Sequence, residues 1–357
     1  MQSLYDYLRW RTWTQTSLQG DYPNLKAAIV VPTLRPDCIH KFLDAWRSEF
    51  AAHYLIVIED NPEPTFNLSG NNVRHFSWSD IDAEFGKDSW IFPRRTDCIR
   101  SYGYYKAWQL QPDLIITLDD DCYPESDGFI ESHWRQLNSP AVSNAWVSSG
   151  KGATPRGVPY DTLAREQECA LNHGLWNNNP DLDAITVLAH KRSPQEFLIL
   201  DQTIPKGAYF PMCGMNLAWK PELSPAMYFL LMGRDWPYDR FGDIWCGILV
   251  KKICDHLNLG IKSGPPYVNH QKKSDQWMNL SRESPVFKMN ETFWQAVDSI
   301  ALSATDISGA YKEIVEMLRL EGDYWSKLRK AMWLWLEIFS GQQHPAAAQM
   351  RAVQTAP

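Results

Sequence analysis

Three continuous apolar runs in the first third of the sequence restrict the fold more than any other feature. AAIVVPT lies at 27–33, YLIVIED at 54–60 and LIITLDD at 114–120. All three runs are rich in β-branched residues and do not alternate with polar ones, which is typical of strands covered on both faces. Helix-like segments at 40–53 and 98–110 separate them. This order predicts βαβ units and an α/β fold with a mostly parallel central sheet.

Polar residues follow each of these strands at its carboxyl end. They are Thr33 to Arg35 after the first strand, Glu59 to Asn61 after the second and Asp119 to Asp121 after the third. In open α/β sheets, ligands bind beyond the carboxyl ends of the strands. We therefore expect the three strand ends to line one crevice.

The third strand ends in three consecutive aspartates. On a strand, side chains at i and i+2 point the same way, so Asp119 and Asp121 are expected to converge while Asp120 faces elsewhere. Convergent carboxylates need a cation between them, and Mg²⁺ or Mn²⁺ shares such ligands with phosphates. The alternative is an acidic turn that caps the next helix. The apolar strand before the aspartates and the two other polar strand ends favour a metal–diphosphate site.

Composition restricts the classes of partner. The chain has 357 residues and a net charge of −7, and its basic residues occur at most in pairs, which argues against a nucleic-acid-binding surface. Seven scattered cysteines without a CxxC pair indicate neither a zinc site nor a disulfide framework, as in a cytoplasmic protein with reduced thiols. No stretch resembles a signal peptide or a membrane span, so we expect no membrane insertion.

The alternation of strand-like and helix-like segments becomes less clear after the third strand. Clustered Gly, Asn and Pro residues predict long loops from about 145 to 200, and the chain is expected to be helical from about 286. The predicted organisation is an N-terminal arm at 1–25, a catalytic α/β domain at 26–285, a helical extension at 286–340 and a flexible tail at 341–357.

Single residues elsewhere add candidates for the site. His270 follows an apparent short strand, although a lone His is more often structural than a metal ligand. Asp243 precedes an apolar helical run, where an Asp is often simply an N-cap. The basic residues that could meet phosphates, each with a solvated surface charge as the default, are Arg35, Arg95, Arg100 and Lys206.

Longer blocks resemble a known family. These are HGLWNNNPDLDA at 173–184, IPKGAYFPMCGMNLAW at 204–219, PAMYFLLMG at 225–233 and KKICDHLNLGIKSGPPYVNH at 251–270, together with LDDDC. They resemble the reversibly glycosylated polypeptides, also called UDP-arabinopyranose mutases, which form glycosyltransferase family 75. The resemblance runs in register from about residue 29 to about residue 275.

The resemblance implies a GT-A-like nucleotide-sugar-binding fold, Mn²⁺ or Mg²⁺ as cofactor, and a UDP-sugar, such as UDP-L-arabinose, as ligand. Family mutases interconvert pyranose and furanose forms, and a protein arginine can be reversibly glycosylated. RGVPY matches the segment that carries this arginine, which places it at Arg156, and a second family arginine matches Arg165. The family's metal-side histidine matches His270. Family members often associate, which leaves a homo-oligomer open.

Residue types and resemblance together give the predicted site. A metal held by Asp121 and His270 would neutralise the diphosphate and stabilise UDP as a leaving group, while Asp243 could stabilise positive charge or move a proton. The predicted metal ligands are Asp121, Asp119 and His270. The predicted nucleotide-binding residues are Asp119, Asp120, Arg35, Asp60, Arg100, Lys206 and His173. The predicted catalytic residues are Arg156, Asp243 and Arg165.

Two departures from the family keep alternatives open. Gly242-Asp243 stands where the family commonly has two adjacent acids, and the loop around Arg156 is rewritten. The leading interpretation is a UDP-L-arabinopyranose mutase that also glycosylates itself. The alternatives are a glycosyltransferase that passes the sugar to a separate acceptor, and a catalytically silent scaffold that binds UDP-sugar or is self-glycosylated.

Overall fold

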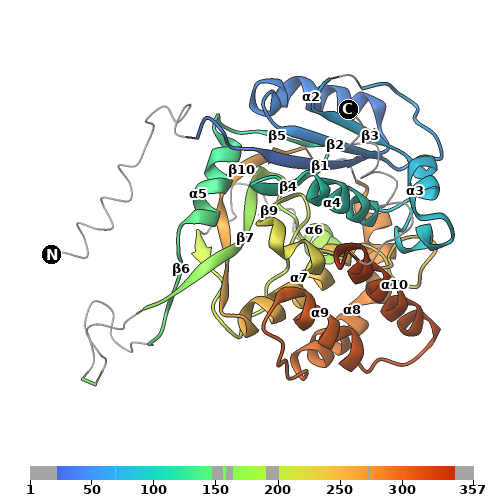
Figure 1. Cartoon of the computed structure of the whole chain (residues 1–357). Coiled ribbons are helices and arrows are strands. Elements are labelled where there is room, and N and C mark those ends of the chain that lie inside the picture. Colours follow the sequence, from blue (N-terminus) through green and yellow to red (C-terminus); the bar gives the residue numbers. More distant parts are fainter. Residues whose placement is uncertain are drawn as a thin grey trace.

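The computed structural model describes residues 22–68, 70–146, 156–157, 164–189, 201–271 and 274–341. Most of the predicted N-terminal arm and nearly all of the predicted tail lie outside these residues. The described part is built around a ten-stranded sheet in the order β3-β2-β1-β4-β9-β7-β10-β5. Helices cover both faces of the sheet, as Figure 1 shows. The α/β fold class is therefore confirmed.

The N-terminal half of the sheet is parallel. Strand β1 pairs with β2 on one side and with β4 on the other, and β2 pairs with β3. The predicted strands and the helices between them are confirmed, with ends that differ by a few residues. The elements of this half are β1 (Ala27–Thr33), α2 (Pro36–Phe50), β2 (Tyr54–Glu59), β3 (Val73–Phe76), α3 (Trp78–Phe85), η1 (Gly86–Ile91), η2 (Asp97–Ile99), α4 (Arg100–Gln109) and β4 (Leu114–Leu118).

The second half of the sheet mixes strand directions. Strand β9 runs antiparallel to both β4 and β7, β10 runs parallel to β7, and β5 runs antiparallel to β10. Two short strands pair at the margins, β6 with the start of β7 and β8 with β10. The bounds are β5 (Cys122–Pro124), β6 (Ala141–Asn144), β7 (Ala164–Asn178), β8 (Gln202–Thr203), β9 (Asn216–Trp219) and β10 (Leu259–His270).

Strand β7 corrects the prediction of loops between 145 and 200. Fifteen residues, AREQECALNHGLWNN, form one strand whose central part is buried. Its polar side chains have partners inside the protein: Asn172 donates to the carbonyl oxygen of Pro265 at 2.9 Å, and His173 is hydrogen-bonded to Ser263 at 2.9 Å. Buried polar groups are stable when they are paired in this way, but the sequence does not reveal the partners.

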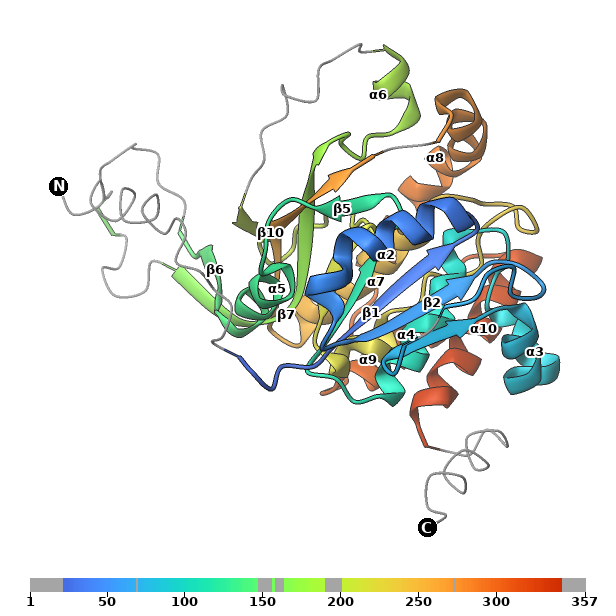
Figure 2. The ribbon, with the colours of Figure 1, turned by 90° about the horizontal axis from the view of Figure 1, so that it is seen from above.

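Two layers of helices enclose the sheet. Helices α2 and α5 (Phe129–Asn138) pack on one face, and α4 and α7 (Gly242–His256) pack on the other. The C-terminal helices lie beyond α7, and α6 lies against α8, as seen from above in Figure 2. The remaining elements are α6 (Ala184–Ala189), η4 (Pro221–Ala226), α8 (Gln276–Asp298), α9 (Ile307–Met317) and α10 (Asp323–Phe339).

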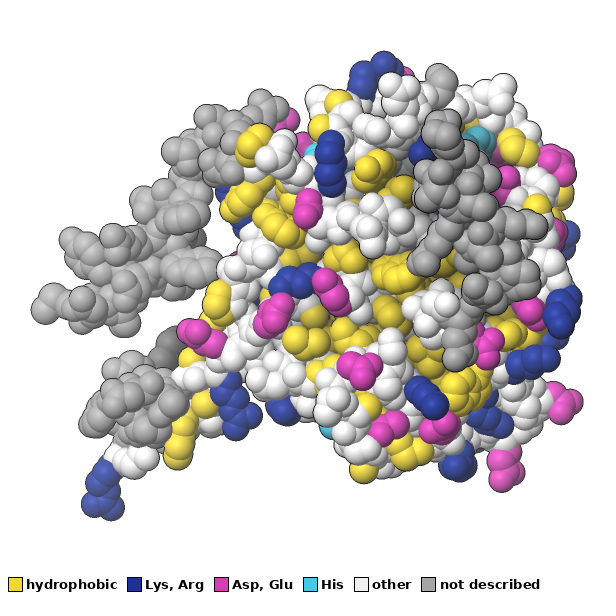
Figure 3. All heavy atoms as spheres, in the orientation of Figure 1, with side chains coloured by type: hydrophobic (Ala, Val, Ile, Leu, Met, Phe, Trp, Pro, Cys, Tyr) yellow, Lys and Arg dark blue, Asp and Glu magenta, His cyan; other side chains and the backbone are white. Residues whose placement is uncertain are grey.

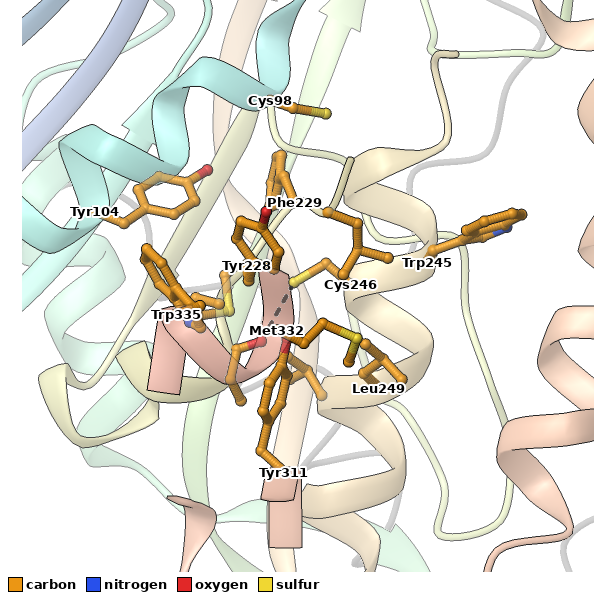
Figure 4. Packing of buried hydrophobic residues seen from close by; sticks show 14 of the residues in the cluster. Cys98, Tyr104, Tyr228, Phe229, Trp245, Cys246, Leu249, Tyr311, Met332 and Trp335 are labelled. Atoms are coloured by element: carbon orange, nitrogen blue, oxygen red, sulfur yellow. Dashed lines mark hydrogen bonds between the residues drawn. The ribbon is translucent and has the colours of Figure 1, made fainter. Parts of the chain in front are cut away.

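The C-terminal helices share their core with the sheet domain. Trp335 of α10 stacks on Tyr228 with ring centroids 5.1 Å apart and donates to the carbonyl of Pro225 at 2.9 Å (Figure 4). Trp245 of α7 stacks on Phe293 of α8 at 4.3 Å. Helix α8 begins at Gln276 and contains Pro285 in its interior. The predicted boundary at 285 therefore lies within one helix. Proline usually ends a helix, but α8 continues through Pro285.

Three further observations concern the surface charges, the cysteines and the length of the helices. On the face in Figure 3, acidic and basic side chains are interspersed rather than gathered by sign. All seven cysteines are buried, and none of them forms a disulfide. Within the described ranges, no helix combines the length and the apolar character needed to cross a membrane.

Candidate active site

The candidate site lies where the strand order reverses. From β1 the sheet continues to β2 and β3 on one side, and the chain then returns to add β4 on the other side of β1. Such a switch point opens a crevice beyond the carboxyl ends of the two strands. Thr33 ends β1, Arg35 follows it, and the three aspartates follow β4. Of the three strand ends expected to line one crevice, these two meet through the Thr33–Asp120 hydrogen bond.

Asp120 is held by the end of β1. The Thr33 hydroxyl donates to Asp120 Oδ2 at 2.6 Å, and Arg35 Nε donates to the same oxygen at 3.3 Å. Arg35 Nη2 also pairs with Asp120 Oδ1 and lies 3.4 Å from Asp121 Oδ2. Burial opposes the charge on Arg35, but the two aspartates outweigh burial and raise its pKa. The Arg35 side chain is 41% exposed and Asp120 only 3%, so Arg35 is the cation of this group that a ligand can reach.

The aspartates lie in a turn, not on the strand. β4 ends at Leu118, and the amide of Cys122 donates to the carbonyl of Asp119 at 3.1 Å. The prediction that the aspartates lie on the strand, with side chains that alternate between its two faces, was therefore wrong. Asp120 nevertheless differs from Asp119 and Asp121, as expected, because the turn directs it toward Thr33 at the end of β1, although it shares Arg35 with Asp121.

Asp121 and His270 face one another. His270 Nε2 lies 3.8 Å from Asp121 Oδ1, and both side chains are about 90% buried or more. His270 Nδ1 lies 2.8 Å from the carbonyl oxygen of Asn179. Since a carbonyl only accepts, Nδ1 carries a proton, and Nε2 is the ring nitrogen that faces Asp121. Burial, and then the nearby charge of Asp119, raise the pKa of Asp121 to about 6.

The donor set suits a cation that shares its ligands with a substrate. Within the described residues, no group of three His, Cys, Asp or Glu side chains is arranged to hold a metal ion. Asp119, one of the three predicted ligands, is paired with Arg100 Nη2 at 2.5 Å. Asp121 has only a longer contact of 3.4 Å with Arg35 Nη2, which already pairs with Asp120, so the Asp121–His270 pair can still accept a cation. Mg²⁺ and Mn²⁺ bind to one or two protein carboxylates and complete their coordination with phosphate oxygens and water, which fits an open pair of this kind.

Asp243 lies in the first turn of α7. Its Oδ2 accepts from the amide of Gly214 at 3.0 Å, and its Oδ1 accepts from the amide of Ile244 at 2.8 Å. Burial, followed by the negative charges of Asp97 and Asp181, raises the pKa of Asp243 to about 7. A carboxyl group with this pKa can both take up and release a proton near neutral pH.

The glycine before Asp243 has no room for a side chain. A Cβ at Gly242 would lie 2.4 Å from Cys98 Sγ and 2.6 Å from the carbonyl oxygen of Phe229. The second contact involves backbone, which cannot rotate away. An acid at position 242 is therefore excluded by the close packing of α7 against η2 and against the backbone at Phe229.

Two predicted nucleotide-binding residues serve the surrounding fold. Asp60 accepts from Trp78 Nε1 at 2.7 Å and from the amides of Arg95 and Thr96 at 2.9 Å each, so it organises that loop. His173 lies within β7 and is 4% exposed, and its Nε2 has no hydrogen-bond partner among the described residues. Burial lowers the pKa of His173 to about 4, which keeps the ring neutral.

Lys206 lies apart from the aspartates. It lines a cavity of about 380 Å³ together with Lys252, Asp255 and His256. The last three of these residues belong to the C-terminal end of α7. Asp243 belongs to the first turn of the same helix, about 20 Å away along its axis. The structure therefore does not bring Lys206 to the crevice.

Arg156 and Arg165 are exposed and also lie outside the aspartate cluster. Arg165 pairs with Ser143 near the start of β7, whereas Asn178 at its other end pairs with His270; these ends are about 40 Å apart. From Arg156 to the start of β7, an extended chain spans at most about 28 Å. Figure 1 shows β6 and the start of β7 standing out from the body.

Several groups of the site were not predicted. Gly214 and Asn179 contribute backbone atoms, and Asp97 contributes charge to Asp243 and its carbonyl oxygen to Arg100. Backbone partners leave no residue-type signal in a sequence. Thr33 was expected at the crevice, but its pairing with Asp120 depends on the register of β1 and β4.

Comparison with known proteins identifies the family. The family model described as "Reversibly glycosylated polypeptide" matches residues 24–344. "Probable UDP-arabinopyranose mutase 1" of Zea mays is 34% identical over 351 residues, which cover 91% of this chain and 93% of the relative. The Pisum sativum protein of the same name is 35% identical, covering 87% and 89% of the two chains. "UDP-arabinopyranose mutase 2" of Arabidopsis thaliana is 33% identical, covering 90% and 93%. The chain therefore belongs to the reversibly glycosylated polypeptide family.

Proposed function

We propose that this protein is a metal-dependent UDP-sugar enzyme that interconverts the pyranose and furanose forms of UDP-L-arabinose. The observation that carries the proposal is the Asp121–His270 pair at the switch point of the sheet, beside the reachable guanidinium of Arg35. Relatives that carry the name UDP-arabinopyranose mutase over about 90% of the chain support the choice of reaction.

Asp121 and His270 would hold the cation, and Arg35 would contact the diphosphate. A bound Mg²⁺ or Mn²⁺ supplies charge that stabilises UDP as a leaving group. Asp120 keeps Arg35 in place through its two contacts with the guanidinium. Asp119 is the neighbouring carboxylate, and its charge is balanced by Arg100.

Asp243 is the proposed proton carrier. In the isomerisation, the bond between the anomeric carbon and the UDP oxygen breaks and UDP leaves as an anion. A different hydroxyl oxygen of the sugar then bonds to the anomeric carbon, and the bond from that carbon to the original ring oxygen breaks. A proton must leave the hydroxyl that becomes the ring oxygen, and another must reach the oxygen that the ring releases. Asp243, whose pKa is raised to about 7, can accept the first and return it. Recombination with UDP then completes the isomerisation without any net loss of atoms.

Self-glycosylation at Arg156 is a separable part of the proposal. Arg156 is exposed, and the β6–β7 segment keeps it away from the Asp121–His270 pair of its own chain. Guanidinium stays protonated in proteins and attacks poorly without a local base. We therefore expect modification in trans, between two copies, so that the labelled fraction rises with protein concentration.

The test is incubation of the protein with a panel of UDP-sugars and Mn²⁺, with products read by NMR and the protein by intact mass. The proposal predicts a furanose product from UDP-L-arabinopyranose and a pentose adduct that Arg156→Ala removes. Transfer to an added acceptor that outpaces isomerisation would instead indicate a glycosyltransferase. Cation-dependent binding of UDP without any turnover would indicate a silent scaffold. Either result contradicts the proposal.

A further inference from the structure

Arg100 lies in an unusual place for a cation. It occupies the first position of α4, where the helix dipole opposes positive charge, and it is 2% exposed. We propose that Arg100 is a positioning residue which, through the backbone of Gly214, fixes Asp119 and Asp243 relative to one another. The inference rests on the proposed function for the roles of those two aspartates. It assigns Arg100 no direct contact with the diphosphate.

The donors of Arg100 are engaged within the protein. Nε donates to the carbonyl of Asp97 at 3.0 Å, and Nη1 donates to Thr117 Oγ1 at 3.0 Å and to the carbonyl of Gly214 at 2.6 Å. Nη2 donates to Asp119 Oδ1 at 2.5 Å. A guanidinium has five N–H donors, so four of them are used before any ligand arrives. A residue that binds phosphate needs several donors free and facing the crevice.

Gly214 joins this guanidinium to Asp243. Its carbonyl accepts from Arg100 Nη1, and its amide donates to Asp243 Oδ2 at 3.0 Å. A Cβ at this position would lie 2.8 Å from the ring of Phe229 and 3.2 Å from Arg100 Nη1. Phe229 is fixed in turn, because its amide donates to Ser101 Oγ at 3.1 Å. Gly214 is therefore clamped between α4 and Phe229 and transmits the position of Arg100 to Asp243.

The arrangement links the two ends of the substrate. Asp119 belongs to the aspartate cluster at the diphosphate, and Asp243 is the proposed proton carrier at the sugar. Loss of Arg100 should therefore displace the sugar-side carboxyl while the Asp121–His270 pair and Arg35 stay in place. The expected result is a large loss of turnover with little loss of UDP affinity.

The experiment compares Arg100→Gln and Arg100→Lys with the wild type. UDP affinity measured by calorimetry with Mg²⁺ should be unchanged, while turnover should fall by about 100-fold, the effect of a misplacement of about 1 Å. In the double variant with Asp243→Asn, the two losses of turnover should be less than multiplicative, since both variants displace the same group. Lys251→Gln is the matched control, because Lys251 is a buried cation, 1% exposed, in the second half of α7. It should leave turnover unchanged.

UDP affinity that falls in parallel with turnover would show that Arg100 binds the diphosphate and would overturn the proposal, as would fully multiplicative effects in the double variant. A second measurement needs no activity. In protein labelled with ¹⁵N-glycine, the Gly214 amide signal should shift in Arg100→Lys and in Asp243→Asn, but not in Lys251→Gln. No shift in either variant contradicts the coupling, even if Arg100→Gln fails to fold. A wild type without mutase activity would instead refute the proposed function and leave this test intact.

Discussion

At the scale of single residues, the three consecutive aspartates differ because each has its own partner. Asp119 is paired with Arg100, Asp120 is held by Thr33 and Arg35, and Asp121 faces His270. Burial raises the pKa of Asp121, whereas the Arg100 guanidinium outweighs burial and lowers that of Asp119. The residue most in need of a cation is therefore Asp121.

Gly242→Ala should destabilise the protein by about 2–3 kcal/mol, because the new methyl group would overlap Cys98 Sγ and the carbonyl of Phe229. Cys98→Ala in the same chain should recover only part of this loss, since the backbone contact remains. The measurement is the free energy of unfolding in urea. Gly309→Ala is the control, because it also lies in the first turn of a helix and its nearest contact is a methyl group at 3.0 Å.

A neutral Gly242→Ala variant would contradict the close approach. If Gly242→Ala loses stability as predicted, Gly242→Asp alone cannot restore the second acid of the family. The aspartate side chain has a Cβ in the same position, where it would overlap Cys98 Sγ and the carbonyl of Phe229.

Asp243 should also give a pH signature. Its folded-state pKa of about 7 lies above the usual carboxyl value of about 4, so the native state loses stability through ionisation of Asp243 as pH rises from about 4 to about 7. Relative to the wild type, Asp243→Asn should therefore gain about 3 kcal/mol in unfolding free energy between about pH 5 and about pH 8. Urea unfolding of both proteins across this range is the measurement. Parallel pH curves would show that Asp243 does not titrate there.

The sequence predicted the residue types of the site better than their geometry. The aspartates, Arg35, His270 and Asp243 were all candidates, because carboxylates and a histidine after strands suggest metal chemistry. It did not predict that the aspartates lie in a turn, since one hydrogen bond after Leu118 decides this.

At the scale of elements, β7 and β10 carry the histidine side of the site, and a buried polar network ties them to α5. His133 Nε2 lies 3.0 Å from Asn216 Oδ1, and its Nδ1 lies 2.9 Å from Asn172 Nδ2. Asn216 Nδ2 also donates to the carbonyls of Leu175 and Pro266, each at 2.9 Å. His133 stays neutral, because burial lowers its pKa to about 3. The network explains why a central strand can contain so many polar residues.

Asn216→Ala should cost about 2–4 kcal/mol of stability, since it leaves two carbonyls and the histidine N–H without partners in the interior. Chemical unfolding measures this directly. Asn138→Ala is the control, because Asn138 makes one hydrogen bond, to the carbonyl of Trp134, at an exposed helix end. Equal losses in the two variants would contradict the importance of the network.

Whether a strand could be predicted from the sequence depended on whether its side chains are apolar or need polar partners on other elements. Strands 27–33, 54–60 and 114–120 were predictable because their side chains are apolar on both faces, whereas β7 was not. Asn172 and His173 of β7 are hydrogen-bonded to α5 and β10, which are far away in sequence. Likewise the helical part was predicted to begin at about 286, but α8 begins at Gln276 and continues through Pro285.

At the scale of the whole molecule, sheet and C-terminal helices share one core, so ligand binding in the crevice should stabilise the entire chain. UDP with Mg²⁺ should raise the melting temperature more than UDP or Mg²⁺ alone, because the cation would share its ligands with the diphosphate. At a ligand concentration of about 100 times Kd, the gain is about 2.7 kcal/mol. Thermal unfolding with each ligand separately and together is the measurement. Additive shifts in wild type would contradict a shared cation.

The central claim is that the Asp121–His270 pair supports a cation-dependent isomerisation of UDP-L-arabinose. The direct measurement is conversion of UDP-L-arabinopyranose followed by NMR, with Mn²⁺ and with a chelator, for the wild type and for Asp121→Ala. We predict that the furanose isomer appears only with wild type and Mn²⁺. If folded wild-type protein that binds UDP yields no furanose, or if Asp121→Ala converts the substrate at the wild-type rate, the claim is wrong.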